Sequence, residues 1–277
     1  MIVALVLVLF LSLSYEAAGL LEEVTALNRT FTTVYRKEQA FLLTESLLPK
    51  ALELLTQEDG SYDALTDAWA RPFSYETPLG TLEVTVVDKE RFLNPNLLGS
   101  SRAYDEAFER LLRLLGIDPI LAYYIKVWIG KAEGSLPTDY PPKRKPMDSI
   151  YEIELFWPDR EELYGSKDKP GLYEFISVFA GPKVNINTAP PLVLMALDER
   201  ITPHLARAVA RARSERPFKT LKELLRVEGV TLDLLYRLER LAGVKSENFR
   251  LVFKLEGFEE RVYFNRPKRK LLLKEIY

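Results

Sequence analysis

The first twenty residues constrain the fold most strongly. Residues 2–15 carry no charge, and Glu16 alone interrupts an apolar or small-residue stretch that reaches Leu21. At 1.5 Å per residue, residues 2–21 would form a helix of about 30 Å, which matches the hydrocarbon core of a bilayer. We therefore predict one membrane-spanning helix. A cleaved secretory signal is the alternative, but such a signal needs a basic leading region, and no Lys or Arg precedes Arg29.

The helical pattern continues beyond this apolar segment. Apolar residues recur in steps of three and four, with acids at two skipped positions and no linker rich in Gly or Pro. This spacing predicts one long helix that is broken or bent at Pro49. A membrane anchor followed by a separate core helix is the alternative. The apolar positions are Leu20, Val24, Leu27, Phe31, Val34, Phe41, Leu48, Leu52 and Leu55.

The remaining chain divides into strands, a helical block and further strands. Residues 82–87 alternate in the period of a strand after a turn at 78–80, and residues 248–277 predict three short strands separated by Gly257 and Pro267. Because unpaired strand edges are a liability, we predict that both groups form one antiparallel sheet against the soluble half of the long helix. The helices predicted between the two groups are 104–115, 119–129, 191–197, 203–213, 221–226 and 232–241.

The composition excludes several kinds of chemistry. The 277 residues include no Cys and one His, His204, which rules out disulfides, thiolate metal sites, Cys nucleophiles and multi-His metal sites. The charge is nearly balanced, at 38 Lys+Arg against 40 Asp+Glu, and this disfavours a strongly basic nucleic-acid binder. Scattered carboxylates such as Asp88 or Asp139 leave an anchored hydrolase as an alternative, although no motif places two acids at catalytic spacing.

Several short motifs resemble those of one protein family. A long apolar helix that continues into a soluble spine beneath a small antiparallel sheet is similar to the pilin architecture. The motifs resemble those of the K-type minor pseudopilins of type II secretion, the GspK family, in the same order over nearly the whole chain. They are Tyr62-Asp63 with Trp69 and Pro72, Gly80-x-Leu82-x-Val84, Asp88-x-x-Arg91-Phe92-x-Asn94-x-Asn96-Leu97, Val184-Asn185-Ile186-Asn187-Thr188-Ala189-Pro190, and Val244-Lys245-Ser246-x-x-Phe249.

This resemblance implies an α+β fold. A pilin-like long N-terminal helix would pack on an antiparallel sheet, and a large all-α domain would be inserted into that sheet. The transmembrane part of the helix would be 1–22. The pilin-like domain would comprise 23–95, with the helix stem and first strands, and the C-terminal strands 243–277, while 96–242 would form the inserted α-helical domain.

The implied role is structural, and no enzymatic activity is expected. K-type pseudopilins lie at the tip of a short periplasmic pseudopilus with I-type and J-type minor pseudopilins and the major pseudopilin, and they promote assembly and protein export across the outer membrane. The chain would cross the inner membrane once, with its bulk in the periplasm. Glu16, Glu22 and Glu23 fit this orientation, since no basic residue accompanies them. The predicted helix-packing interface is Val3, Leu5, Leu7, Leu9, Val24, Leu27 and Phe31.

The absence of an early acid agrees with a tip position. Major pilins carry Glu at the fifth mature position, where it neutralises the buried N-terminal amine of the preceding subunit. Here the fifth residue is Leu5, and no acid precedes Glu16. A tip subunit has no predecessor and needs no such acid. A plain anchor helix also lacks one.

Residues 184–230 also resemble helix-hairpin-helix modules, which bind the DNA backbone. A membrane-anchored DNA-binding protein for DNA uptake is therefore the alternative function, although no nucleic-acid partner is expected. Such modules need a Gly-x-Gly hairpin to hold a phosphate, and residues 198–202 contain two acids and no glycine. Arginines between Arg200 and Arg216 predict a solvated helical face. Asn187 or Thr188 is the predicted N-cap of the helix at 191–197.

Calcium is the cofactor that the resemblance raises. The family often has an Asp-Trp-x-Asp segment in a calcium loop, and the matching residues 127–130 here have lost both acids. Glu133, Asp139 and Asp148 remain as weak candidate ligands beside the basic residues 143–145. Because Ca²⁺ prefers six to eight oxygens, a solvated loop without metal is the alternative.

Overall fold

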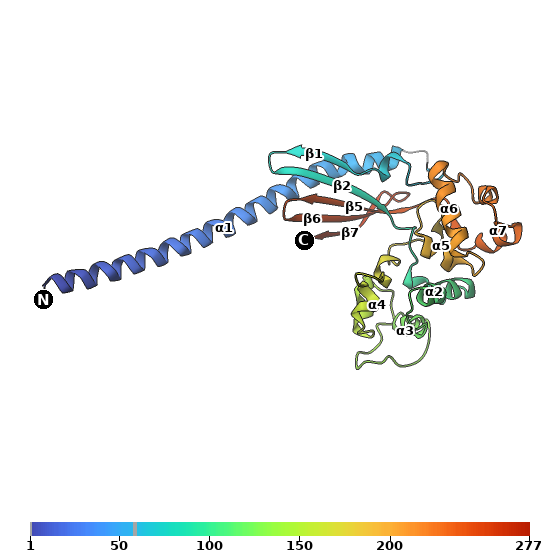
Figure 1. Ribbon diagram of the computed structural model, residues 1–277, viewed down its shortest axis with the longest axis horizontal. Coiled ribbons are helices and arrows are strands. Elements are labelled where there is room, and N and C mark those ends of the chain that lie inside the picture. The colour runs from blue at the N-terminus through green and yellow to red at the C-terminus, as the bar shows by residue number, and fades with distance from the viewer. Residues whose placement is uncertain (1, 58–59) are drawn as a thin grey trace.

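In the computed structural model, the residues that can be described are 2–57 and 60–277. Met1, the start of the predicted membrane segment, lies outside them. A single helix, α1 (Ile2–Gln57), extends from the folded body as a rod (Figure 1). The predicted continuity of membrane segment and soluble stripe is therefore confirmed. Of the break or bend predicted at Pro49, the break is wrong, because α1 continues through this residue.

Packing explains how α1 tolerates Pro49. A proline inside a helix removes one backbone hydrogen bond and costs about 3 kcal/mol. The turns around Pro49 bury Leu48 and Ala51 against the sheet, and this burial offsets the lost bond. The buried residues of α1 recur every three or four positions along one face, namely Ala40, Thr44, Leu48, Ala51 and Leu55.

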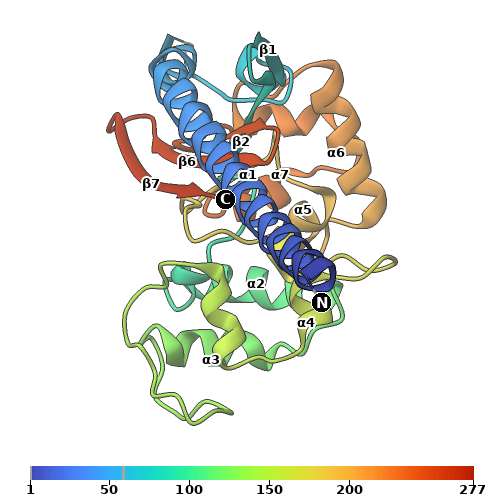
Figure 2. The same cartoon turned by 90° about the vertical axis from the view of Figure 1, so that its left-hand side faces the viewer.

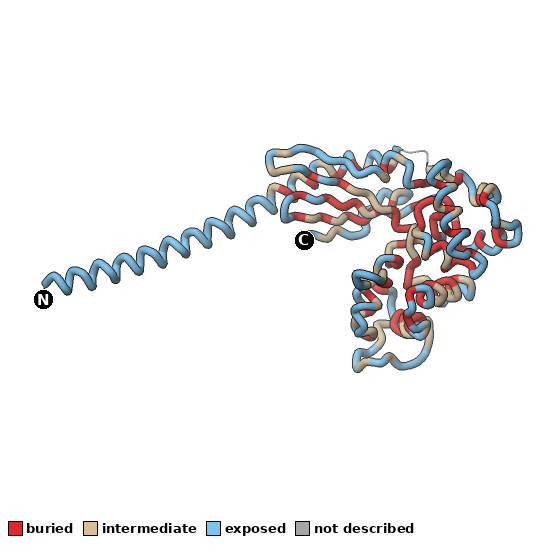
Figure 3. The backbone as a smooth tube through the Cα atoms, in the orientation of Figure 1, coloured by how far each residue is buried: buried red, intermediate tan, exposed pale blue. Residues whose placement is uncertain are grey.

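The N-terminal two-thirds of α1 touches nothing in the folded body. All residues from 2 to 38 are exposed, and the first buried residue is Ala40 (Figure 3). At 1.5 Å per residue this exposed part is about 55 Å long. The predicted apolar stripe thus has two parts. Its C-terminal residues, such as Leu48 and Leu55, pack on the sheet, whereas its residues from Leu20 to Val34 are exposed.

The strands before and after the helical block form one antiparallel sheet, as predicted. The strand order is β1-β2-β5-β6-β7, and Val84 of β2 lies opposite Phe253 of β5. β1 was not predicted as a separate strand. Its residues are mostly exposed at the sheet edge, so they show no alternation of apolar and polar side chains. The strands are β1 (Phe73–Thr77), β2 (Gly80–Asp88), β5 (Asn248–Leu255), β6 (Phe258–Asn265) and β7 (Lys270–Ile276).

One hydrophobic cluster joins α1 to this sheet. Alternate residues of β5 point toward the helix, which is the two-residue period expected of a half-buried strand. Trp69, from the short 3₁₀ helix Ala68–Ala70, packs edge-on to Phe249 with ring centroids 5.2 Å apart. The cluster includes Leu48 and Leu55 of α1, Leu82 and Val84 of β2, and Phe249, Leu251, Phe253 and Leu255 of β5.

The helical block lies at the end of the sheet away from the free end of α1 (Figures 1 and 2). A short parallel pair, β3 (Val184–Asn185) and β4 (Ala242–Gly243), closes it. The predicted helix at 221–226 is a 3₁₀ helix. Other 3₁₀ segments are Pro95–Leu97, Ile150–Leu155 and Leu172–Glu174. The α-helices are α2 (Arg102–Leu114), α3 (Ile120–Trp128), α4 (Arg160–Tyr164), α5 (Pro191–Leu197), α6 (Pro203–Glu215) and α7 (Leu232–Leu238).

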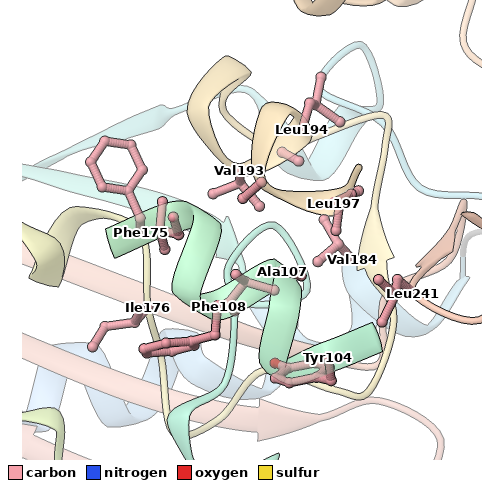
Figure 4. Packing of buried hydrophobic residues seen from close by; sticks show 14 of the residues in the cluster. Tyr104, Ala107, Phe108, Phe175, Ile176, Val184, Val193, Leu194, Leu197 and Leu241 are labelled. Atoms are coloured by element: carbon pink, nitrogen blue, oxygen red, sulfur yellow. The ribbon is translucent and has the colours of Figure 1, made fainter. Parts of the chain in front are cut away.

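The block has a hydrophobic cluster of its own. α2 contributes Tyr104, Phe108 and Leu111 on one face, and these pack among residues from α5 such as Val193 and Leu197 (Figure 4). The cluster extends from Leu93 to Val244 along the chain, close to the predicted limits of the inserted domain. The domain limits themselves stay a prediction.

Candidate functional site

The exposed rod is the first candidate site. The seven predicted packing residues all lie on it with exposed side chains, from 51% for Val24 to 82% for Val3. Around residues 2–13 the apolar side chains point in every direction, which is the pattern of a helix in lipid. α1 is long and apolar enough to cross a membrane. The choice of these seven residues as the packing surface stays a prediction: Val3, Leu5, Leu7, Leu9, Val24, Leu27 and Phe31.

The second candidate site is a buried polar cluster where the sheet meets the helical block. We call it the polar junction. It collects residues from segments that are far apart in the sequence, and many of them belong to the motifs that carry the family resemblance. Its members are Asp63, Asp88, Glu90, Asn185, Thr188, Ser246, Asn248 and Arg266.

A buried ion pair holds one side of the polar junction. Both carboxylate oxygens of Asp63 accept hydrogen bonds from the Arg266 guanidinium, each at 2.7 Å. The Asp63 side chain is fully buried and that of Arg266 is 12% exposed. Asp63 also accepts from the backbone N–H of Ser246 at 2.7 Å, and Arg266 donates to the Ser246 carbonyl at 2.6 Å. These hydrogen bonds therefore hold the segment that follows α1 against the loop that precedes β5.

Asn185 connects three segments at the centre of the polar junction. Its side-chain amide donates to the Asp63 carbonyl at 3.0 Å and to the Ser246 hydroxyl at 2.8 Å. Its backbone N–H donates to the Glu90 carbonyl at 2.8 Å. The Thr188 hydroxyl donates to the Asp88 carboxylate. The motif at 184–190 thus joins the helical block to both groups of strands.

The prediction of Asn187 or Thr188 as a helix N-cap is wrong. The N-cap of α5 is Pro190, which makes no side-chain bond, and Pro191 begins the helix. Asn187 instead exchanges two 2.9 Å hydrogen bonds with the backbone of Phe218. The polar junction and this pairing were not predicted from the sequence. The usable signal was the polar run Asn-x-Asn-Thr inside an otherwise apolar stretch, because buried polar groups need partners.

Burial raises the pKa values of two carboxyl groups in the polar junction. Burial raises the pKa of Asp88, and the same effect together with the charge of Asp88 raises the pKa of Glu90 to about 9. Glu90 accepts from the backbone N–H of Asn248 at 3.0 Å and from its side-chain amide at 2.7 Å. At neutral pH Glu90 is therefore protonated, and the pair carries at most one negative charge.

Glu90 predicts a pH dependence of stability. The stabilisation from its protonated form is complete below the ordinary pKa of 4.5 and is lost as the pH rises toward 9. We expect the unfolding free energy of Glu90→Gln to rise relative to that of wild type by about 4–5 kcal/mol between pH 5 and pH 8.5, at about 1.4 kcal/mol per pH unit. Urea unfolding of both proteins across this range measures the difference. Lys89 contributes a pH dependence of opposite sign, because its lowered pKa makes its burial more destabilising as the pH falls toward 7. Lys89 is present in both proteins, so its contribution cancels in the difference between them.

The control for this prediction is Glu215→Gln, which removes an exposed carboxylate at the end of α6. Urea unfolding of this variant over the same pH range gives the reference. A Glu90→Gln difference from wild type that does not grow with pH would contradict protonation of Glu90.

The structure does not bring the three candidate calcium ligands together. Asp148 pairs with Lys143 at 2.7 Å, Glu133 lies 3.7 Å from Arg144, and Asp139 is exposed. Among residues 2–57 and 60–277, no group of three or more acidic or His side chains is placed to hold a metal ion. Cations thus occupy two of the three carboxylates, and the geometry lends the calcium prediction no support.

The region between α5 and α6 does not form a phosphate cradle. Asp198 is buried and accepts from the Arg200 backbone N–H at 3.0 Å and from Arg237 Nε at 2.7 Å. The prediction of a fully solvated arginine face is wrong at Arg213, which is buried and donates to the Ile186 carbonyl at 2.6 Å. These contacts neutralise or bury the charges that DNA phosphates would need.

Two comparisons with known proteins found matches to components of type II secretion systems. The family model of type II secretion system protein K matches residues 184–243, the segment that begins at β3 and ends at β4. No curated protein matches the chain. A chain of the GspK–GspI–GspJ complex from the type 2 secretion system of enterotoxigenic Escherichia coli matches with a TM-score of 0.64 and 18% identity, over 87% of this chain and 96% of that one. The predicted resemblance is therefore confirmed: residues 184–243 match the family model of type II secretion system protein K, and the fold is similar to that of a chain in the GspK–GspI–GspJ complex.

Proposed function

We propose that this chain is a K-type minor pseudopilin that promotes assembly of a type II secretion pseudopilus and protein export. In this proposal α1 anchors the chain in the inner membrane with residues 2–21, and the folded body lies in the periplasm. I-type and J-type minor pseudopilins are the partners, in keeping with the complex that contains the similar chain. The role is structural, so no catalytic residue is assigned.

One observation carries this proposal most directly. The segment that matches the protein K family supplies Asn185 and Thr188 to the polar junction, which joins the helical block to a pilin-like helix and sheet. The residues that match the family model are therefore also residues that hold the helical block against the helix and sheet. The unbroken α1 adds the second requirement of a pilin-like subunit, an apolar helix that is free to move from lipid into a helical bundle.

Leu7→Asp tests the role of the exposed rod. An Asp at the centre of a membrane helix costs about 2.5–3.5 kcal/mol, so we expect a several-fold loss of carbonate-resistant membrane association and a fall in secretion. Leu54→Asp is the matched control, because Leu54 is also an exposed leucine of α1 but lies 47 residues beyond Leu7, beside the sheet. Unchanged membrane retention and secretion in Leu7→Asp would contradict the proposal.

Co-purification tests the choice of partners. The full chain is expressed with I-type and J-type pseudopilins and isolated in detergent, and a ternary complex is the expected result. The DNA-uptake alternative predicts retention of duplex DNA at low salt, with a steep loss as salt rises. The comparisons do not support that alternative, and the contacts of Asp198 and Arg213 argue against it.

A further inference from the structure

A large cavity lies between the sheet and the helical block. Its volume is about 520 Å³, within the usual range of small-molecule sites. One wall comes from the segment after β2, with Lys89, Arg91 and Phe92, and another from the sheet, with Arg250 and Tyr263. The helical block closes it through residues 173–179. The chemistry of this cavity has no part in the assembly role proposed above.

Three cations in this cavity lack an anionic partner. Within the described part of the chain, Lys89, Arg91 and Arg250 form no ion pair at 4.0 Å or less. Lys89 is 5% exposed, and its Nζ lies 4.6 Å from the Phe92 ring centroid and 5.8 Å from that of Tyr263. The Nε atoms of Arg91 and Arg250 are buried and find no acceptor among the described residues. Buried cations without an anionic partner destabilise the folded state unless a bound anion supplies the missing charge and acceptors.

The nearby acids are already engaged. The carboxyl groups of Asp88 and Glu90 are hydrogen-bonded within the polar junction, and Glu90 is protonated. The charge of Asp88 acts on Lys89 and Arg91 but forms no ion pair with either at 4.0 Å or less. Among the acids that line the cavity, Asp148 pairs with Lys143 at 2.7 Å. Glu174 accepts from the Gly171 backbone at 3.0 Å, and Glu275 accepts from the Tyr263 hydroxyl at 3.4 Å. The fourth cation of the wall, Arg261, pairs with Glu259 at 2.6 Å.

We propose that this cavity binds an oxyanion, a carboxylate or a phosphate group, through Lys89, Arg91 and Arg250. The buried guanidinium N–H groups and the ammonium group supply charge-assisted donors to its oxygens. The rings of Phe92, Tyr173 and Phe179 line the space around these donors and would contact the remainder of the ligand. The ligand supplies the missing negative charge, so its binding stabilises the folded chain.

Protonation of Lys89 couples this binding to pH. Burial and repulsion by Arg250 lower the pKa of Lys89 to about 7, so part of the population is neutral at physiological pH. A bound anion favours the charged form, and binding therefore takes up a proton above pH 7. The affinity should fall by up to tenfold per pH unit between about pH 7.5 and 8.5.

Calorimetry on the full chain in detergent tests the proposal. The probes are inorganic phosphate and N-acetyl-glutamate at pH 6.5, titrated at constant ionic strength with sodium chloride as the blank. We expect saturable heat and a rise in melting temperature with at least one probe. Binding of phosphate alone or of N-acetyl-glutamate alone supports the site and identifies the source of the anion. Absence of saturable binding for both probes overturns the proposal.

Variants separate this site from a purely structural cluster. Arg250→Gln and Lys89→Met should each weaken binding at least tenfold, while Arg211→Gln, which removes an exposed arginine of α6, should leave it unchanged. Without a ligand, Lys89→Met should raise the melting temperature, because it removes an unpaired buried cation. A melting temperature lowered by Lys89→Met, or wild-type affinity in Arg250→Gln, would contradict the assignment.

Discussion

Replacing Arg266 by Met should lower the free energy of unfolding by about 3–5 kcal/mol. The substitution keeps an apolar stem of similar length but leaves the fully buried carboxylate of Asp63 without its two 2.7 Å donors. An uncompensated charge then remains inside the polar junction. Urea unfolding of the full chain in detergent, followed by tryptophan fluorescence, gives the change in free energy.

The matched control is Arg102→Met, which removes another arginine with a single carboxylate partner. Arg102 pairs with Glu106 one turn away on α2, and its side chain is 92% exposed. Solvent screening limits such pairs to less than about 1 kcal/mol. Similar losses in the two variants would show that burial of the Asp63–Arg266 pair has no special energetic importance.

Phe108→Ala should destabilise the helical block by about 3–5 kcal/mol. Phe108 is fully buried on α2, near Tyr104 and Ile176 at the centre of the block (Figure 4). The substitution removes an aromatic ring from a close-packed region and leaves a cavity that neighbouring side chains fill only in part. Trp128 and Trp157 belong to this block, and Trp69 packs in the sheet, so fluorescence of single-tryptophan versions locates the loss.

Tyr236→Ala provides the control within the same block. Tyr236 lies on α7 with 68% exposure, and its loss should change stability by less than about 0.5 kcal/mol. If Phe108→Ala lowered the stability of the sheet around Trp69 as much as that of the block, the two hydrophobic clusters would unfold as one unit. Separate transitions would mean that the polar junction connects two independently stable parts.

The sequence allowed the elements with a clear repeating pattern to be predicted. The three-and-four spacing of α1 and the two-residue alternation of β5 and β6 reflect which face is buried, so all three elements were predicted with correct type and close limits. β1 and the two-residue strands β3 and β4 were missed. β1 is exposed on nearly every residue, and two residues are too few to show a period.

The polar junction could not be predicted, for a different reason. Its contacts join residues up to 203 positions apart, such as Asp63 and Arg266, and no local pattern records which polar side chains will meet. The motif residues at 184–190 were singled out correctly, but local reasoning gave them a helix-capping role. Burial made long-range partners available to Asn187 and Thr188, and these replaced the local bonds.

The exposed part of α1 sets the clearance of the folded body above the bilayer. Residues 22–38 add about 25 Å of stalk beyond the membrane segment, while each headgroup layer is only about 5–8 Å deep. No Gly or Pro interrupts residues 20–40, so the stalk is stiff and acts as a lever. Deleting one residue from it would lower the body by about 1.5 Å and turn it by about 100° around the rod axis. The length of the stalk therefore sets the direction in which the body faces around the rod axis, and deletions of seven or eleven residues, which leave a net turn of only about 20°, would nearly restore it.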